Sequence, residues 1–137
     1  MPRHVRIDIA GQFYHVIARG NERKNIFNAK EDCEDFLSRL RVNLKKTGNK
    51  CLAWCLMPNH FHLLILRGES PLAELMRRLM TGYAVGFNIR HRRVGHLFQN
   101  RYKALLCEEE KYFRELVAYI HLNPLRAGLV NDMVALK

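Results

Sequence analysis

Residues 51–66, CLAWCLMPNHFHLLIL, decide the fold because they read as two apolar runs joined by a tight turn. Residues 51–56 and 60–66 are each long enough for a buried strand. Pro58-Asn59 is a favourable pair for the centre of the turn. The stretch therefore predicts a β-hairpin near the middle of the chain.

A strand and a helix are expected before the hairpin. Residues 13–19 are rich in β-branched and aromatic side chains and end at Gly20-Asn21, which favours a strand closed by a turn. Asn28 and Glu31 have the spacing of a capping box. Apolar residues then recur at helical spacing until Gly48, at Cys33, Phe36, Leu37, Leu40 and Leu44. This pattern predicts a helix that faces the core.

Two more helices and a strand are expected after the hairpin. Ser70 precedes a proline at the first helical position, and apolar residues from Leu72 to Phe87 then follow one helix face. Residues 97–106 alternate, with Gln99, Arg101 and Lys103 on one side, which predicts a strand with a polar face. Acidic residues 108–110 and an apolar stripe predict a last helix ending near Pro124.

This order is strand, helix, strand, strand, helix, strand, helix. It predicts an α+β, ferredoxin-like split βαβ fold: an antiparallel sheet with helices on one face and the other face available to a ligand. A length of 137 residues suits one domain over residues 1–137. The chain ends shortly after Val130, as a chain lacking part of a longer tail would.

The composition indicates a basic globular protein. There are 23 Lys and Arg residues against 13 Asp and Glu, a formal net charge of +10, and 48% of residues are hydrophobic. Such an excess suits a polyanion such as nucleic acid, or else solvated surfaces. No apolar run approaches the roughly 20 residues that cross a bilayer, and the first residues lack the apolar stretch of a signal peptide. A soluble cytoplasmic protein without a membrane partner is expected.

The four cysteines lie in apolar segments without close CxxC pairing, so they are expected to be buried thiols: Cys33, Cys51, Cys55 and Cys107. Zinc binding by Cys51 and Cys55 is the less favoured interpretation. The three residues between them, inside a predicted strand, give poor ligand geometry.

His60-Phe61-His62 is the strongest local signal for chemistry. Side chains at positions i and i+2 of a strand share one face, so the two imidazoles lie side by side. Such a pair can hold one divalent metal ion if at least one more protein ligand is supplied. Packed or hydrogen-bonded histidines give the same pattern, so the spacing alone leaves both interpretations open.

Tyr119 and Asn123 form the second candidate pair. Tyr119 is offset from the apolar stripe of the last predicted helix, and Asn123 follows four residues later on the same face. A nucleophile and a metal ligand can share a helix face in this way. The alternative is that Asn123, which precedes Pro124, caps a short terminal helix, and a residue before proline also resists the α conformation.

Two motifs carry a resemblance to a family. Residues 57–64, MPNHFHLL, and residues 119–128, YIHLNPLRAG, resemble the HUH single-strand transposases, most closely the REP-associated tyrosine transposases. Residues 13–27, which include Arg19-Gly20-Asn21, are similar to the opening segment of that family. The resemblance extends from about residue 13 to residue 130.

The resemblance implies a metal-dependent single-stranded DNA transposase and endonuclease that acts through a covalent 5′-phosphotyrosine. It implies that His60 and His62 bind Mg²⁺ or Mn²⁺, that Tyr119 is the nucleophile, and that Asn123 takes the place of the third ligand. Other branches commonly carry glutamine at that position, and His121 competes for the role. The implied partner is single-stranded DNA, such as hairpin-forming repeats or element ends, and the protein is implied to be a monomer or a homodimer.

The basic residues expected to contact DNA phosphates are Arg19, Arg23, Lys24, Arg101 and Lys103.

Two alternative functions stay open. A rolling-circle initiator or relaxase-like nickase shares the paired histidines and the tyrosine but usually places them in a different chain order. A non-catalytic single-stranded nucleic-acid-binding module would bind without regard to metal or to Tyr119.

Overall fold

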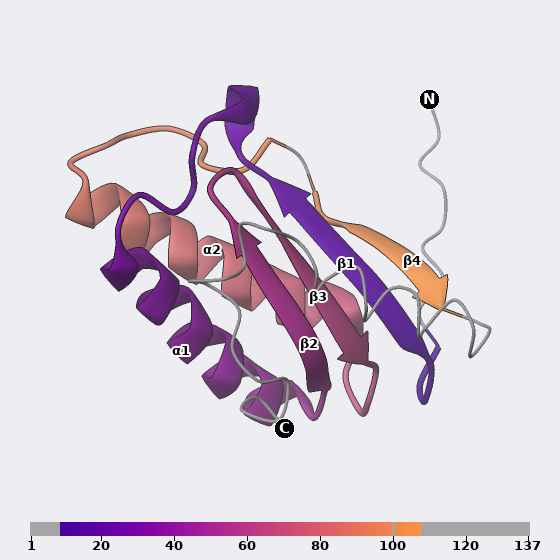
Figure 1. Ribbon diagram of the computed structural model, residues 1–137. Helices are drawn as coiled ribbons and strands as arrows, with labels where there is room; N and C mark the ends of the chain where they lie inside the picture. Colours follow the sequence, from indigo (N-terminus) through magenta and orange to yellow (C-terminus); the bar gives the residue numbers. More distant parts are fainter. Residues whose placement is uncertain (1–8, 100, 108–137) are drawn as a thin grey trace.

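In the computed structural model, residues 9–99 and 101–107 are described, and they form one four-stranded sheet with two helices (Figure 1). The elements in chain order are β1 (Phe13–Arg19), a single 3-10 turn at Asn21–Arg23, α1 (Lys30–Thr47), β2 (Lys50–Met57), β3 (His60–Leu66), α2 (Leu72–Arg90) and β4 (Lys103–Cys107). The predicted last helix and both of its candidate site residues, Tyr119 and Asn123, lie outside the described residues.

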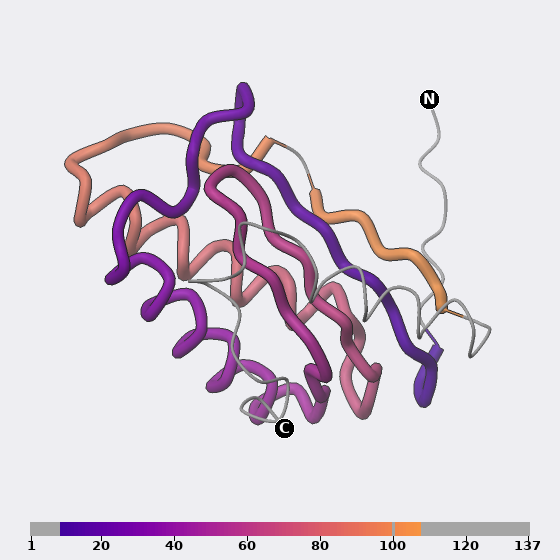
Figure 2. The backbone as a smooth tube through the Cα atoms, viewed as in Figure 1, coloured from indigo at the N-terminus to yellow at the C-terminus, as the bar shows by residue number. Residues whose placement is uncertain are grey.

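The strands are arranged in the order β2-β3-β1-β4, and each neighbouring pair is antiparallel. The backbone trace shows β1 running between β3 and β4 (Figure 2). Each helix thus connects two strands that have another strand between them, which is the split βαβ arrangement. The predicted α+β, ferredoxin-like fold is confirmed.

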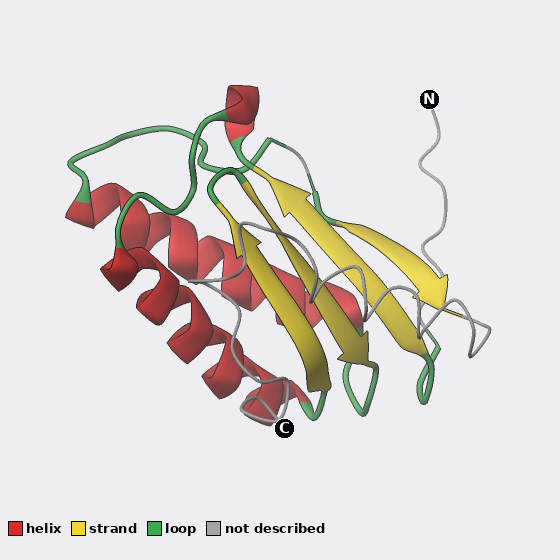
Figure 3. Ribbon diagram, in the orientation of Figure 1, coloured by secondary structure: helices red, strands yellow, loops and turns green. Residues whose placement is uncertain are grey.

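Both helices cover the same face of the sheet (Figure 3). In β1 the side chains of Tyr14, Val16 and Ala18 alternate toward the helices and are buried, as are Phe61 and Leu63 in β3. Alternation gives each strand one apolar side for this core, and the opposite side is left for other residues. Tyr83 and Tyr102 are buried in the same core.

Helix α1 begins one residue later than the sequence pattern predicts. Asp32, and not Glu31, supplies the capping carboxylate: its Oδ2 accepts hydrogen bonds from the backbone N–H groups of Asn28 at 2.8 Å and Ala29 at 3.0 Å. The helix ends as predicted at Gly48, whose φ of 69° is left-handed and suits glycine. Helix α2 likewise begins one residue late, at Leu72 after Pro71.

The fourth strand is shorter than the predicted span of 97–106. It occupies Lys103–Cys107, while Phe98 makes only an isolated bridge to Gly20. The reason is that backbone groups near Phe98 bond to the end of β1 and the loop after it, since Asn21 N–H donates to the Leu97 carbonyl at 2.8 Å. The predicted alternation survives: Lys103 shares a face with Ile17, and Ala104 packs on the core.

The second face of the sheet carries apolar side chains beside its polar ones. A second cluster of buried residues lies there, formed by Ala53, Cys55, Met57, Leu64 and Cys107. All four cysteines are buried thiols, as predicted. Within the described ranges, neither helix is long and apolar enough to cross a membrane.

Candidate functional site

Strand pairing decides which residues meet on the second face of the sheet. Across β1 and β3, Arg19 is opposite His60, Ile17 is opposite His62, and His15 is opposite Leu64. Directly opposite residues in an antiparallel pair point to the same face. The two predicted histidines therefore share a face with Arg19 and with a third histidine, His15.

The three imidazoles form one cluster. The ring centroids of His60 and His62 are 5.0 Å apart with the planes nearly perpendicular at 76°. The rings of His15 and His62 are stacked with centroids 5.1 Å apart, and His15 Nε2 lies 2.9 Å from His62 Nδ1. Only 6% of each of His15 and His62 is exposed. The structure thus places the predicted pair together and adds a partner from β1.

Sequence reasoning missed His15. The available signal was a single polar residue inside an apolar strand, between Tyr14 and Val16. That signal does not reveal a partner for His15, because the partner depends on which strand lies beside β1 and in which register.

Burial and nearby positive charge keep these imidazoles neutral at physiological pH. Burial lowers the pKa of His15 to about 4. For His62, burial comes first and the charges of His15, His60 and Arg19 add to it, so that the pKa falls to about 3. Burial and then Arg19 also lower the pKa of His60. A neutral imidazole carries a lone pair that can accept a hydrogen bond or bind a cation.

His60 is oriented by its neighbour in the hairpin turn. Its Nδ1 lies 2.8 Å from the Asn59 side-chain oxygen Oδ1, and the Asn59 amide nitrogen donates to the Arg23 carbonyl at 3.5 Å. An amide oxygen accepts only, so His60 Nδ1 carries the proton and Nε2 carries the lone pair.

A metal ion would need more than the described part of the chain supplies. In the described ranges, no three side chains of His, Cys, Asp or Glu are placed to hold a metal ion. The donor chemistry of His60 and His62 fits two ligands of a divalent ion, since both are neutral imidazoles on one face. The third donor of the predicted set, Asn123, lies outside the described residues.

A basic pocket adjoins the histidines. It has a volume of about 250 Å³, and its lining includes Arg19, Arg101 and Lys103 together with Gln99 and Ile17. Arg19 is the cross-strand neighbour of His60, and Ile17 is paired with both His62 and Lys103. Among the described residues, no ion pair engages these three cations. Three of the five predicted DNA contacts therefore line one pocket, and strand pairing places two of them, Arg19 and Lys103, on the same face as the predicted metal ligands.

The other two predicted contacts, Arg23 and Lys24, lie in the loop after β1 and do not line this pocket. Lys24 is paired with the exposed Glu22 at 3.3 Å. Glu22 and Arg23 both have left-handed backbone conformations, with φ of 55° and 61°, which is uncommon outside glycine.

Backbone hydrogen bonds fix this loop onto the tip of the β2–β3 hairpin. Gly20 N–H donates to the Asn59 carbonyl at 2.8 Å, and Ile26 N–H donates to the Pro58 carbonyl at 2.7 Å. Gly20 has no room for a side chain, because an added Cβ would lie 2.0 Å from the Lys24 carbonyl oxygen. The loop therefore holds the histidine end of the sheet in place.

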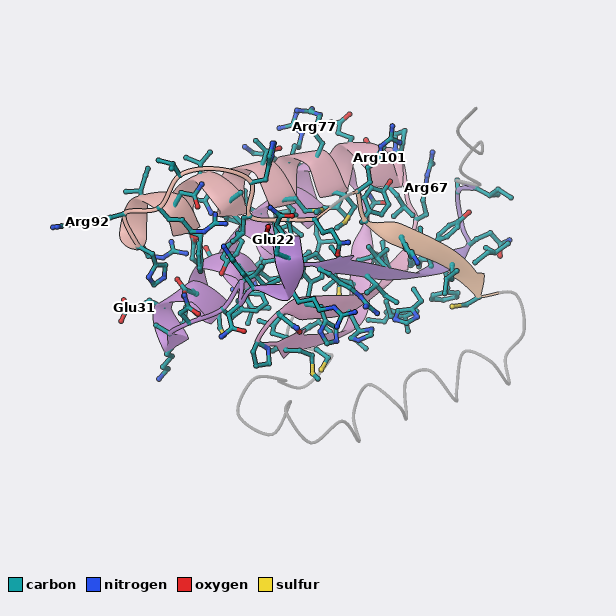
Figure 4. The ribbon with its side chains drawn as sticks, turned by 90° about the horizontal axis from the view of Figure 1, so that it is seen from above. Glu22, Glu31, Arg67, Arg77, Arg92 and Arg101 are labelled. Atoms are coloured by element: carbon teal, nitrogen blue, oxygen red, sulfur yellow. The ribbon has the colours of Figure 1, made fainter. Side chains whose placement is uncertain are left out.

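Positive charge is not confined to the histidine face. Arg77 lies on the outer side of α2, away from the sheet (Figure 4), where Arg77 and Lys46 help to line a groove between the two helices. What sets the sheet face apart is the combination of neutral imidazoles with unpaired cations. Neutral nitrogen donors suit a divalent cation, and neighbouring cations suit the phosphate oxygens of a nucleic acid.

Comparison with known proteins gives a family match for the chain. Residues 9–123 match the family model described as "Transposase IS200 like". The matched span covers most of the chain and includes His60, His62, Tyr119 and Asn123. A comparison with curated protein sequences gives no significant match.

Two solved structures resemble the chain. One is the structure of a REP-associated tyrosine transposase bound to a REP hairpin, with a TM-score of 0.71 and 19% identity, covering 98% of this chain and 79% of the other. Another is a crystal structure of a candidate transposase from Deinococcus radiodurans R1, with a TM-score of 0.58 and 19% identity, covering 88% and 95% of the two chains. At this identity the two likenesses show the fold alone.

Proposed function

The chain belongs to the IS200-like transposase family, and from this premise we propose that it is a metal-dependent single-stranded DNA transposase and endonuclease. It cleaves and rejoins DNA through a covalent 5′-phosphotyrosine at Tyr119. The observation that carries the proposal is the pairing of two neutral imidazoles, His60 and His62, with an adjoining basic pocket, since strand pairing places Arg19 and Lys103 of that pocket on the histidines' face of the sheet.

His60, His62 and Asn123 are the proposed ligands of Mg²⁺ or Mn²⁺. The metal ion, when bound, supplies a positive charge that polarises the scissile phosphate. Neutral ligands leave that charge undiminished, which favours binding of a phosphate. Low histidine pKa values support this role because a protonated imidazole has no lone pair to donate.

Tyr119 is the proposed nucleophile. Its hydroxyl oxygen bonds to the phosphorus as the bond from phosphorus to the 3′ oxygen breaks. The phenol proton is lost and the leaving oxygen becomes a 3′ hydroxyl, so one phosphoester replaces another. Attack by a different 3′ hydroxyl reverses the step and joins two strands without an external energy source.

Arg19, Arg101 and Lys103 are proposed to hold the phosphates of the strand at the scissile position, because their pocket adjoins both histidines. Arg23 and Lys24 are proposed to contact DNA outside that pocket. The REP-associated relative was solved with a DNA hairpin, which supports a hairpin beside the single strand as the DNA partner here.

The test is covalent adduct formation on a denaturing gel. The full-length protein is incubated with labelled single-stranded DNA from the flanks of its own gene, with Mn²⁺, with Mg²⁺, or with chelator. The expected result is a metal-dependent protein–DNA adduct that is absent in Tyr119→Phe. Tyr112→Phe is the matched control, since it removes a phenol hydroxyl from the same predicted helix and should leave the adduct intact.

Two results would overturn the proposal. An adduct that persists in Tyr119→Phe would exclude Tyr119 as the nucleophile. Binding of DNA without any adduct, unaffected by metal and by Tyr119→Phe, would support the non-catalytic binding module instead.

A further inference from the structure

His15 and His62 form a buried hydrogen bond, and the distance between the rings does not reveal which of them is the donor. His15 Nε2 and His62 Nδ1 are 2.9 Å apart, a hydrogen-bond distance, and both side chains are only 6% exposed. One of the two nitrogens donates a proton and the other accepts it. Which one donates determines the atom of His62 that carries the remaining lone pair.

The charges around the cluster select one direction. Nδ1 of His62 is engaged with His15, so Nε2 is the ring nitrogen left over for other neighbours. His15 and Arg19 flank Ile17, the cross-strand neighbour of His62, on opposite sides, and the charge of Arg19 also acts on the His62 ring. Arg19 is the cross-strand neighbour of His60 and carries an unpaired positive charge within the described residues. A lone pair facing a cation is favourable, whereas an N–H group facing it is not. His62 Nδ1 is then the donor, and His15 Nε2 is the acceptor.

His60 provides a parallel on the same strand. Its Nδ1 donates to the Asn59 side-chain oxygen at 2.8 Å, which places its own lone pair on Nε2. With His62 arranged in the same way, both histidines carry the proton on Nδ1 and present Nε2 as donor atom. Partners that fix the tautomer and ring orientation of metal-binding histidines commonly act in this manner.

We propose that His15 is a positioning residue: it accepts the Nδ1 proton of His62 and so fixes Nε2 of His62 as the atom that binds the divalent cation. This inference rests on the proposed function, because it assumes that His62 is a metal ligand. Its first consequence, the tautomer of His62, concerns the metal-free protein and needs no catalysis.

The test uses three variants of the full-length protein. His15→Leu removes the acceptor while keeping an apolar side chain of moderate size. His15→Gln restores an acceptor through its side-chain oxygen. Leu64→Val is the matched packing control, since Leu64 is fully buried directly opposite His15 and has no hydrogen bond to give.

The first readout is the histidine tautomer, measured by long-range ¹H–¹⁵N correlation in the metal-free protein. In the wild type and in Leu64→Val, His62 should carry its proton on Nδ1. His15→Leu should shift His62 toward the form with the proton on Nε2, and His15→Gln should restore the wild-type form. A purely structural role for His15 would not reverse with glutamine.

The second readout is the affinity for Mn²⁺, measured by electron paramagnetic resonance without DNA. The expected loss in His15→Leu is about 10- to 100-fold, with most of it recovered in His15→Gln. Two results would overturn the inference: a proton on Nε2 of His62 in the wild type, or unchanged Mn²⁺ affinity in His15→Leu. If both readouts are as expected but the wild-type protein forms no covalent adduct with DNA, the proposed function would be overturned and the role of His15 would remain.

Discussion

Among the described residues, two side-chain clusters contain histidine, and they differ in the charge of their neighbours. In the sheet cluster, His15 and His62 contact each other beside Arg19. In the helix cluster, His91 at the end of α2 contacts both carboxylate oxygens of Asp32 in α1, at 2.9 and 3.0 Å. One histidine therefore lies against an anion, and the other lies among neutral and cationic groups.

The helix cluster has its charges balanced within the fold. Asp32 is fully buried, and besides His91 it accepts a hydrogen bond from Arg90 Nε at 2.8 Å. Burial raises the pKa of Asp32, but hydrogen bonds from the Asn28 backbone, His91 and Arg90 outweigh it and lower the pKa overall. Arg90 also bonds to Asp35 at 2.8 Å, so the cluster joins α1 to α2.

The difference teaches which histidines are candidates for function. A histidine satisfied by a carboxylate, as in the helix cluster, holds elements together. Imidazoles kept neutral beside cations, as in the sheet cluster, retain a lone pair that can bind a metal ion.

The largest expected effect is on stability, from Asp32→Asn. The amide keeps an oxygen for the α1 cap but leaves Arg90 without its buried anion. The expected loss is about 3 kcal/mol of unfolding free energy, as for a broken buried ion pair. His62→Gln should cost only about 1 kcal/mol, since it removes one neutral hydrogen bond.

Urea unfolding of the metal-free protein measures both variants, because chelation removes any stabilisation by bound metal. If the two variants lose equal unfolding free energy, or if His62→Gln loses more, the helix cluster does not stabilise the fold more than the sheet cluster does.

The second prediction concerns pH. The pKa values of His15 and His62 are about 4 and about 3 in the folded protein, below the 6.5 of a free histidine. Between those values the unfolded chain binds protons that the folded chain excludes, so the unfolding free energy should fall as pH drops from about 6.5 toward 4. Asp32 acts at lower pH. Because folding lowers its pKa, its contribution to the unfolding free energy is kept until the pH falls below 3.8, the ordinary pKa of an aspartate.

The measurement compares urea midpoints at pH 7.5 and pH 5 for the wild type and for a variant carrying both His15→Leu and His62→Leu. The wild type should lose more stability between the two pH values than the double variant does. An identical pH dependence in both proteins would mean that these two histidines do not control the loss.

The smallest expected effect is on the salt dependence of DNA binding. Arg19→Ala and Lys103→Ala should each weaken single-stranded DNA binding and reduce the slope of log affinity against log salt by about 0.7, the loss of one phosphate contact. Arg77→Ala, on the outer side of α2, is the matched control and should leave the slope unchanged.

Fluorescence anisotropy with labelled oligonucleotides over a range of salt concentrations gives the slopes. If the slope is reduced in Arg77→Ala but unchanged in Arg19→Ala, the DNA binds on the helix side of the molecule and the sheet pocket is not part of the site.

Most of the fold followed from local patterns. The central hairpin, the two described helices and the order of elements along the chain were predicted from periodicity and turn residues, because these signals are local in the sequence. The misplaced boundaries have local causes as well. The α1 cap moved because Asp32 competes with Glu31 as the capping carboxylate, and β4 became shorter because residues near Phe98 bond to the end of β1 and its loop.

The sequence by itself determined that His60 and His62 share a strand face, since side chains two residues apart in a strand must do so. Only the tertiary structure decided that His15 contacts His62 and that Arg19 lies opposite His60. It also decided that a cluster of buried, mostly apolar residues lies on the same face. The physical reason is that strand register joins residues more than forty positions apart, and it is set by the packing of the whole sheet rather than by any local preference.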